Sequence, residues 1–475
     1  MRTHHIEREG NGESFRIGIV SGKLGGVDGV SLEVDKWIDI LTSLGHTVFT
    51  IAGYYPQPLS RIPEGRQFLL PDLRFDSDFQ RKVEHNVFPH MSRRPYHPTP
   101  LELRQLVEQI ETRGRELGEE VYEIVKDARL DVLIGQNTNA MPMTILGGVA
   151  MYYVATTQRV ATIFHHHDFW WERSRFSNSR IETLLTKIMP PVDLGLEHVV
   201  ISSYAAHILQ SLKRVSPHIV PNCEDFEHPV VPDDYNRKFR RDFGFTDEDI
   251  LIVQPTRIVP RKRIEDSVSL MGRLARKYPE LADRLHYIIS LYQGDEPDEE
   301  YIRVITRRAE QWGIRIHIIS DRVQSVRGVD SEGRRLYTNR DVLVNADIVT
   351  YLPIWEGFGN ALLEAVAAKV PVVTTTYLVY KTDIMVAGFD MIEIRDRYNA
   401  DDELVVDDGV FEQIYRTLHD PEERARMVDH NFVVGAREFG LTQLEKHLKE
   451  LLEDYGDEIR ASRKRLGKAR ARYSV

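Results

Sequence analysis

The sequence has almost no cysteine: Cys223 is the only one among 475 residues. A lone cysteine cannot form a disulfide within the chain, which is typical of proteins in a reducing compartment. The chain also lacks an uncharged apolar run of about 18 residues, the length that a membrane-spanning helix needs. Its polar beginning, MRTHHIEREGNGES, has no apolar centre of the kind found in signal peptides. We therefore expect a cytoplasmic protein without an integral membrane segment.

Basic residues are outnumbered by acidic ones, 62 against 73, which gives a formal net charge of −11. A net negative charge repels the phosphates of nucleic acids, so we expect no nucleic-acid partner, although a local basic patch can still bind a small anion. Hydrophobic residues make up 42% of the chain and charged residues 28%, a balance typical of globular proteins. The sequence therefore predicts a folded protein and leaves a homo-oligomer open.

The length predicts two domains, because a single hydrophobic core rarely grows beyond about 250–300 residues. We expect residues 1–14 to be a loose tail. Over residues 15–53 a β-rich run, an amphipathic helix and a second β-rich run follow one another, which is the pattern of a parallel βαβ unit. Residues 54–100 show no clear periodicity, and we interpret them as a long loop that shapes an acceptor site. Strand and helix patterns then alternate again up to residue 222.

A polar, acidic stretch, CEDFEHPVVPDDYN, follows residue 222 and has the composition of an interdomain linker. We therefore place an N-terminal domain at residues 15–223 and a C-terminal domain at residues 224–430. The C-terminal domain repeats the alternation, so we predict an α/β protein with two doubly wound domains. Its predicted strands lie at residues 250–255, 285–291, 314–320, 347–353 and 371–376.

Residues 431–475 are predicted to be charged helices that pack back toward the N-terminal domain. The basic run RKRLGKARAR near their end indicates a solvated helix end, with a membrane-binding surface as the less favoured alternative.

The segment IWEGFGNALLEA directly follows a predicted strand, and ligands of open parallel sheets bind at the carboxyl ends of the strands. Its two glycines precede a predicted helix start near Asn360, where backbone N–H groups can bind hydroxyl or phosphate oxygens. Glu356 lies on the loop and Glu364 about a turn inside the helix, and both carboxylates can accept hydrogen bonds from sugar hydroxyls. The plainer alternative is a glycine turn beside two surface glutamates.

This segment resembles the signature of glycosyltransferase family 4, in which seven residues separate two glutamates. The resemblance extends over nearly the whole chain and implies the GT-B fold, in which two Rossmann-like domains face each other across a cleft. It implies that Glu356 contacts the transferred sugar and that Glu364 binds the nucleotide ribose. It also implies that backbone amides hold the sugar and the diphosphate, and these belong to Gly357, Phe358, Gly359 and Asn360.

Two cations follow another predicted strand in the segment PTRIVPRKRIEDSV. Arg257 and Lys262 can neutralise a diphosphate, and stabilising the charge of a leaving group is often the largest contribution to catalysis. The resemblance implies that an arginine and a lysine at this spacing bind the departing nucleoside diphosphate. Because Arg261 and Arg263 make the whole segment basic, a solvated helix start is the alternative.

A glycine-rich turn, GKLGGVDGVS, follows the first predicted strand. Such a turn permits close backbone approach to an anion, but its spacing matches neither the usual dinucleotide-binding fingerprint nor a P-loop. It resembles the Gly-Gly-Val turn of family 4, which reaches the phosphates. Gly25 and Gly26 are therefore candidate donor-binding residues.

The segment IFHHHDFWWER joins three histidines to an aspartate after a predicted strand. Neighbouring residues at a strand end point in alternate directions, so a metal site is the less favoured interpretation. The resemblance implies that a histidine here lies beside the donor sugar, and we favour His167, with His166 as the alternative. Asp168 is a candidate acceptor-side group. Trp170 and Trp171 are equally consistent with the core and with a sugar-stacking surface.

Two segments depart from the family pattern. The usual Pro-Asn-Gly-Val-Asp stretch between the domains reads PNCED here, and a frequent Gly-Gly-x-x-Glu turn is replaced by YLVYKTDI after residue 376. The contacts of that turn therefore cannot be transferred to this chain.

These features predict a retaining hexosyltransferase. The transferred sugar, glucose or mannose, would pass from a nucleoside-diphosphate sugar to a small polar acceptor such as a sugar, a sugar phosphate or a glycerate-type compound. Retention is implied by the resemblance alone, and the base of the nucleotide stays open. We expect no cofactor and no metal, because cationic side chains would stabilise the diphosphate. The alternatives are a nucleotide-sugar epimerase or hydrolase on the same fold and a non-catalytic nucleotide-sugar-binding protein.

Overall fold

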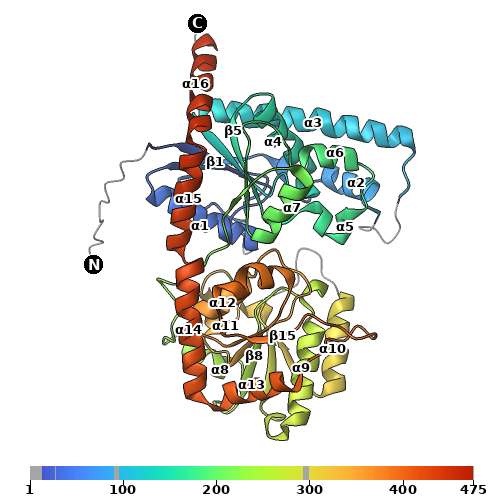
Figure 1. Ribbon diagram of the computed structural model, residues 1–475, viewed down its shortest axis with the longest axis vertical. Helices are drawn as coiled ribbons and strands as arrows, with labels where there is room; N and C mark the ends of the chain where they lie inside the picture. The colour runs from blue at the N-terminus through green and yellow to red at the C-terminus, as the bar shows by residue number, and fades with distance from the viewer. Residues whose placement is uncertain (1–12, 27, 90–95, 292–298, 474–475) are drawn as a thin grey trace. The chain divides into compact units, whose positions relative to one another are not determined.

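The computed structural model describes residues 13–26, 28–89, 96–291 and 299–473. It divides into two compact units, each with its own parallel sheet and its own core (Figure 1). Unit 1 comprises Met1–Pro221 and Leu444–Val475, and unit 2 comprises Asn222–Gln443. The predicted α/β class with two doubly wound sheets is confirmed.

Unit 1 contains a seven-stranded sheet in the order β3-β2-β1-β4-β5-β6-β7. All of its strand pairs are parallel, and the central strand β4 is buried along its whole length. Parallel strands covered on both faces need continuous apolar runs, which explains why the sequence pattern reveals them. The strands are β1 (Arg16–Ser21), β2 (Thr47–Ala52), β3 (Gln67–Leu69), β4 (Val132–Gln136), β5 (Ala161–His166), β6 (Glu197–Val200) and β7 (His218–Ile219).

The helices of unit 1 begin and end at residues suited to those positions. The Asp28 carboxylate caps α1 by accepting a hydrogen bond from the Ser31 N–H at 3.1 Å, and the chain leaves this helix through Gly45, whose φ of +87° favours glycine. Thr99 and Glu102 form a capping box at the start of α3. The helices are α1 (Gly29–Ser43), α2 (Asp78–Val87), α3 (Pro100–Asp127), α4 (Ile145–Thr156), α5 (Ser174–Ser177), α6 (Glu182–Ile188) and α7 (Ser203–Lys213).

The predicted long loop at residues 54–100 is wrong for part of its length, since β3 and α2 lie within it. Strand β3 has only three residues, too few for a pattern. Helix α2 buries a thin stripe that includes a polar residue: the Gln80 side chain donates to the Pro142 carbonyl at 2.8 Å and accepts from the Ile145 N–H at 3.0 Å. Residues 90–95 lie outside the described part of the chain.

The end of the chain packs against the sheet of unit 1. Helix α14 (Pro421–Phe439) belongs to unit 2, so the predicted limit at residue 430 falls inside a helix, and α15 (Leu441–Asp454) and α16 (Gly456–Tyr473) follow it. The N–H of Thr162 donates to the Tyr455 hydroxyl at 3.0 Å, and the N–H of Ala161 donates to the Ser462 hydroxyl at 3.0 Å. These contacts fix the beginning of β5.

The basic run in α16 is only partly a solvated helix end. Its first residue, Arg463, donates to the buried carboxylate of Asp131 at 2.8 Å, whereas Lys464 and Lys468 are exposed. The expectation of a purely solvated run is therefore wrong at Arg463, because a buried carboxylate at the start of β4 needs a cationic partner.

Unit 2 contains a six-stranded parallel sheet in the order β10-β9-β8-β13-β14-β15, and a separate antiparallel hairpin of β11 and β12. The three-residue β15 and the hairpin were not predicted. The strands are β8 (Ile250–Gln254), β9 (Leu285–Ile289), β10 (Arg315–Ile318), β11 (Gly328–Val329), β12 (Arg335–Leu336), β13 (Ile348–Tyr351), β14 (Val372–Thr375) and β15 (Ile392–Ile394). The helices before α14 are α8 (Phe239–Asp242), α9 (Ile264–Lys277), α10 (Glu299–Trp312), α11 (Asn339–Leu343), α12 (Asn360–Ala367) and α13 (Asp408–His419).

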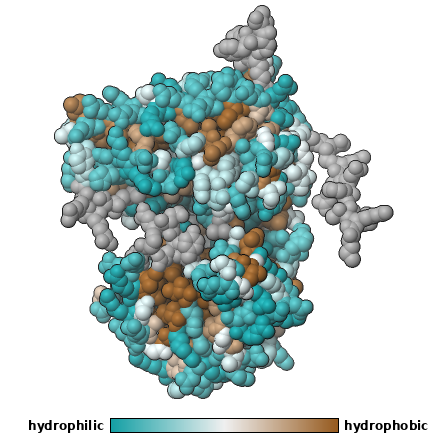
Figure 2. Space-filling view, turned by 180° about the vertical axis from the view of Figure 1, so that it is seen from behind, coloured by the Kyte–Doolittle hydropathy of each residue, from teal (hydrophilic) through white to brown (hydrophobic). Residues whose placement is uncertain are grey.

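The surface is mainly hydrophilic on the face that Figure 2 shows, with a gathering of apolar residues on unit 2. Within the described ranges, no helix combines the length and the apolar character needed to cross a membrane.

Candidate active site

The carboxyl ends of two neighbouring strands in unit 2, β8 and β13, bring Lys262 and Glu356 together. The Lys262 ammonium and the Arg261 guanidinium both pair with Oε1 of Glu356. Lys262 is 8% exposed and Glu356 is 9% exposed. The structure thus joins two predicted site residues that lie far apart in the sequence.

Burial and charge set the protonation of this pair. Burial alone would raise the pKa of Glu356, but Arg261 and Lys262 outweigh it and lower the pKa to about 2. Burial lowers the pKa of Lys262 to about 8, with Glu356 opposing the shift and Arg261 and Arg257 adding to it. At neutral pH the carboxylate is ionised and the lysine is mostly charged. The cations around Glu356 outnumber it, which suits an anionic ligand.

Arg261 belongs to this cluster although no pattern in the sequence favours it over its neighbours. Its carbonyl accepts a hydrogen bond from the Ile354 N–H at 3.1 Å, so backbone and side chain both link the loop after β8 to the loop after β13. Arg263 instead donates to Asp266 at 2.7 Å and pairs with Asp402 at 2.8 Å. The two arginines therefore have different partners, and Arg261 reaches Glu356 because β8 pairs with β13.

Arg257 lies close enough to Lys262 to lower the pKa of that lysine. Its side chain is half-buried, and within the described part of the chain it makes no hydrogen bond and no ion pair. A half-buried guanidinium in this position can bind an anion without first breaking a bond within the protein.

The glycine turn after β13 requires glycine at one position. Gly359 has φ of +151°, and a Cβ there would lie 2.5 Å from the Tyr377 hydroxyl. That hydroxyl donates to the Phe358 carbonyl at 2.6 Å, and Asn360 accepts a hydrogen bond from Asn222 at 2.7 Å. No side chain caps the start of α12. Tyr377 and Asn222 therefore hold the two residues that flank Gly359.

Glu364 is held by a residue that the sequence did not point to. Its Oε2 accepts a hydrogen bond from the Asn339 side chain at 2.8 Å. Glu364 and Glu356 both raise the pKa of the Tyr351 hydroxyl, after burial, which is the largest cause. Both glutamates of the motif therefore lie close enough to Tyr351 to affect its pKa.

In unit 1 the glycine turn after β1 is packed tightly. Gly25 has φ of +76°, and a Cβ there would lie 2.9 Å from the Leu59 side chain. A Cβ on Gly26 would lie 2.7 Å from the Asp28 carboxylate, which is 3.6 Å from the Lys23 ammonium. A larger side chain would therefore strain the turn at Gly25, whereas at Gly26 only the ends of the flexible Asp28 and Lys23 side chains would have to move.

The three histidines after β5 differ in exposure. His165 and His166 are 1% exposed, whereas His167 is partly exposed. The His165 ring stacks on Trp37 at 4.4 Å, and the His166 ring lies within hydrogen-bond distance of His198, at 2.9 Å between ring nitrogens. His167 is thus the member of the group that a ligand can reach.

Two residues from the end of β4 hold His167. Its Nε2 lies 3.1 Å from Oε1 of Gln136, and its backbone N–H donates to the Asn137 side chain at 3.1 Å. Burial lowers its pKa to about 4, against the opposing effects of Asp168 and Asp28. Asp28, which follows the two glycines of the turn after β1, lies close enough to His167 to affect this pKa. At neutral pH this imidazole is uncharged.

Asp168 accepts hydrogen bonds from Arg173 at 2.7 Å and from Asn137 at 3.2 Å. The Trp170 indole donates to the Met189 carbonyl at 2.9 Å and is 7% exposed, so this ring belongs to the core. Trp171 stacks on Phe169 at 4.7 Å. Among the residues that the structure describes, no three His, Cys, Asp or Glu side chains form a group that could hold a metal ion.

The chain is similar to known proteins over most of its length. The family of glycosyl transferases group 1 matches residues 236–431. Mannosylglucosylglycerate synthase from Thermotoga maritima is 32% identical over 447 residues, which cover 91% of this chain and 98% of that protein. The protein of the same name from Petrotoga mobilis is 27% identical over 434 residues, which cover 87% of this chain and 95% of the relative.

Solved structures share the fold at low sequence identity. Sucrose-phosphate synthase from Thermosynechococcus elongatus is 13% identical with a TM-score of 0.62, covering 93% of this chain and 98% of the other. The Anabaena protein HepE in complex with UDP-glucose is 12% identical with a TM-score of 0.60, covering 93% and 100%. The chain therefore belongs to the glycosyl transferases group 1 and is a glycosyltransferase with the GT-B fold.

Proposed function

We propose that this enzyme transfers a mannosyl group from a nucleoside-diphosphate mannose to a glucosylglycerate acceptor, with retention of the anomeric configuration. The observation that carries the proposal is the 32% identity with mannosylglucosylglycerate synthase, which extends over 98% of that relative. The product named there contains mannose, glucose and glycerate, so its acceptor would belong to the glycerate-type compounds expected from the sequence.

The donor binds mainly to unit 2 in this proposal. Arg257 and Lys262 neutralise the diphosphate, without the help of a metal ion. Glu356, whose pKa of about 2 keeps it ionised, accepts hydrogen bonds from hydroxyls of the mannosyl group. Arg261 shares Oε1 of Glu356 with Lys262, so the carboxylate keeps a cationic partner when the lysine turns to the phosphate. Glu364 binds the ribose.

The transfer step needs no nucleophile from the protein. The bond between the anomeric carbon and the phosphate oxygen breaks, and the acceptor hydroxyl oxygen bonds to that carbon on the face from which the diphosphate leaves. The hydroxyl proton passes to the departing phosphate oxygen. Arg257 and Lys262 stabilise the negative charge that develops on the diphosphate.

The acceptor binds to unit 1 through hydrogen-bonding groups. His167 is uncharged because burial lowers its pKa to about 4, so it does not act as a general acid. It hydrogen-bonds to a hydroxyl of the mannosyl group that is transferred. The Asp168 carboxylate, oriented by Arg173 and Asn137, accepts hydrogen bonds from acceptor hydroxyls.

A donor and acceptor panel tests the proposal. UDP-, GDP- and ADP-linked mannose and glucose are each incubated with glucosylglycerate, glycerate, glucose and a sugar phosphate, with and without EDTA. We expect one mannose donor and glucosylglycerate to give the highest turnover, an α-linked product by NMR and no loss with EDTA. Absence of product from every mannose donor, or an inverted linkage, would contradict the proposal.

The same panel separates the alternative functions. Free sugar released without an acceptor would indicate a hydrolase, and a changed sugar on the recovered nucleotide would indicate an epimerase. Binding without any turnover would indicate a binding protein. A ligand at 100 times its Kd should then raise the free energy of unfolding by about 2.7 kcal/mol, which a thermal-shift assay detects as a higher melting temperature.

A further inference from the structure

Asn339, the first residue of α11, bridges two segments at the carboxyl edge of the unit 2 sheet. Its Nδ2 donates to Oε2 of Glu364 at 2.8 Å, and its Oδ1 accepts from the hydroxyl of Ser290 at 2.6 Å. Ser290 directly follows β9 and is 0% exposed. Because the Ser290 hydroxyl occupies the oxygen end of the amide, the nitrogen end faces Glu364.

The start of α11 is itself held rigidly. The Asp341 carboxylate accepts hydrogen bonds from the N–H of Thr338 at 2.9 Å and from its hydroxyl at 2.8 Å, and Thr338 in turn accepts from the Asp341 N–H at 3.2 Å. This capping box fixes the turn that carries Asn339. The Asp341 side chain is 0% exposed.

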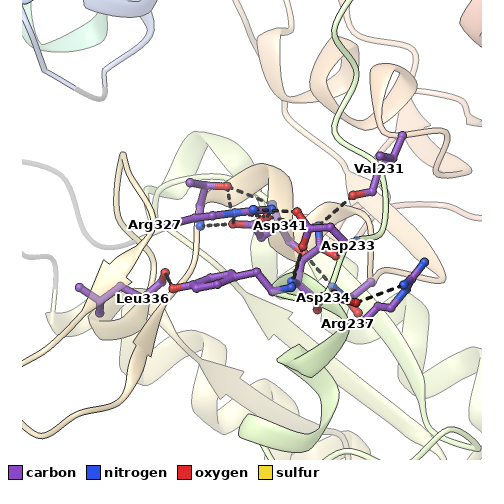
Figure 3. Close-up of polar contacts among 11 residues, drawn as sticks. Val231, Asp233, Asp234, Arg237, Arg327, Leu336 and Asp341 are labelled. Carbon is purple, nitrogen blue, oxygen red and sulfur yellow. Dashed lines mark hydrogen bonds and ion pairs between the residues drawn. The ribbon is translucent and has the colours of Figure 1, made fainter. Parts of the chain in front are cut away.

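Arg327, which directly precedes the hairpin of β11 and β12, also belongs to this cluster. Arg327 donates from Nε to both carboxylate oxygens of Asp341, at 3.1 and 3.0 Å, and from Nη1 to Asp233 at 2.7 Å. Figure 3 shows Arg327 pointing between Asp341 and Asp233, with Val231 on the segment that carries Asp233. Three segments of unit 2 therefore meet at α11, next to the side chain that holds Glu364.

We propose that Asn339 is a positioning residue, which presents the Glu364 carboxylate to the ribose hydroxyls of the donor nucleotide. The inference rests on the proposed function, since it takes Glu364 as the ribose ligand. A carboxylate on a helix can rotate about its side-chain bonds, and an N–H donor fixed on Oε2 selects one orientation. Hydrogen bonds from hydroxyls to a carboxylate are strong only in good geometry, so the orientation decides how well ribose is distinguished from deoxyribose.

The test is the ratio of dissociation constants for a nucleoside diphosphate and its 2′-deoxy form, measured by titration calorimetry on the full chain with GDP, UDP and ADP. We expect the unchanged protein to bind the best ribonucleotide about ten times more tightly than the deoxy form, or more. Asn339→Asp keeps the shape but loses the N–H donor, and Asn339→Ser loses the amide without adding charge. Both should bring the ratio to within about twofold of one.

Two further variants make the result decisive. Glu364→Ala should also bring the ratio close to one. Asn345→Ala is the matched control at the other end of α11, where Asn345 donates to the carbonyls of Asn236 at 3.0 Å and Asp341 at 2.8 Å. This control should lower the melting temperature and keep the ratio of the unchanged protein.

The outcomes separate the inference from the function on which it rests. If Glu364→Ala loses the discrimination and both Asn339 variants keep it, the positioning role is wrong while the ribose assignment stands. If Glu364→Ala keeps the discrimination, the ribose assignment fails and the positioning role fails with it. Mannosyl transfer is measured separately, so its absence in the panel would overturn the proposed function even where the ribose ratio behaves as expected.

Discussion

The two units place opposite chemistry at the same position of the same kind of sheet. At the strand ends of unit 2, Lys262 and Glu356 form a buried ion pair in which the carboxylate has a pKa of about 2. At the strand ends of unit 1, the buried histidines are uncharged at neutral pH, and burial lowers the pKa of His167 to about 4. The strand ends of unit 2 thus carry a buried ion pair, and those of unit 1 carry uncharged histidines next to the Asp168–Arg173 ion pair.

This difference follows from which residues surround each group. Burial opposes ionisation at both edges. In unit 2 the neighbouring cations Arg261 and Lys262 compensate for it at Glu356, whereas the neighbours of the histidines are aromatic rings such as Trp37 and Phe169. A buried ion pair has a high cost of desolvation. Binding a diphosphate requires positive charge, which accounts for the cations at this edge. Sugar hydroxyls need no such charges.

The largest effect is expected from removing the cation in unit 2. Lys262→Ala should lower kcat by about 10²–10³-fold, because it takes away charge stabilisation from the leaving diphosphate. Steady-state kinetics with the preferred donor measure the loss.

Arg263→Gln is the matched control for this variant. Arg263 is the next residue in the same basic run, but it pairs with Asp266 and Asp402 away from Glu356. Its kcat should stay within a few-fold of the unchanged enzyme. Equal losses in the two variants would mean that the cations of this segment act through the fold rather than through the diphosphate.

This basic run also shows how far the sequence could predict the site. The segment after β8 was identified because cations following a buried parallel strand are visible in the sequence. The choice of Arg261 over Arg263 depends on the pairing of β8 with β13, which no local pattern contains. Asn339 was missed for the same reason, since its contact with Glu364 joins α11 to α12.

The fold followed from the sequence where strands are long and buried. β4 and β8 are buried along their whole length and read as apolar runs. β15 has three residues, and α2 has only a thin buried stripe, so the sequence pattern of neither differs clearly from that of the residues around it. Short edge elements depend on tertiary contacts more than on their own periodicity.

An intermediate effect is expected at the beginning of β5, the strand that carries the histidines. The Tyr455 hydroxyl accepts from the Thr162 N–H at 3.0 Å and donates to the Gly195 carbonyl at 2.6 Å. Tyr455→Phe leaves the buried Thr162 N–H without that partner, so the free energy of unfolding should fall by about 1–3 kcal/mol. Chemical denaturation measures it.

The same variant sharpens the comparison of the two units. Tyr455 lies in unit 1, so the dissociation constant for the donor nucleotide, which we assign to unit 2, should not change. A weakened nucleotide affinity in Tyr455→Phe would contradict the assignment of nucleotide binding mainly to unit 2.

The smallest effect is expected from the neutral histidines of unit 1 on mild acidification. The pKa of His167 is lowered to about 4, and those of His165 and His166 are lowered well below the ordinary value of 6.5. The unfolded chain therefore binds more protons than the folded one, and stability present above pH 6.5 is lost as the pH falls toward 4. Each histidine contributes at most about 1.4 kcal/mol per pH unit. The Glu356 contribution, with a pKa of about 2, is lost only at lower pH, between about 4.5 and 2.

His165→Phe isolates one of these groups. Burial also lowers the pKa values of two histidines in unit 2, His286 and His317. The comparison must therefore be between the variant and the unchanged protein. Phenylalanine keeps the stacking on Trp37 and removes two ring nitrogens that, among the described residues, have no hydrogen-bond partner. Calorimetric melting at pH 7 and pH 5.5 should show a smaller loss of stability in the variant, and equal losses would mean that His165 does not resist protonation in the folded state.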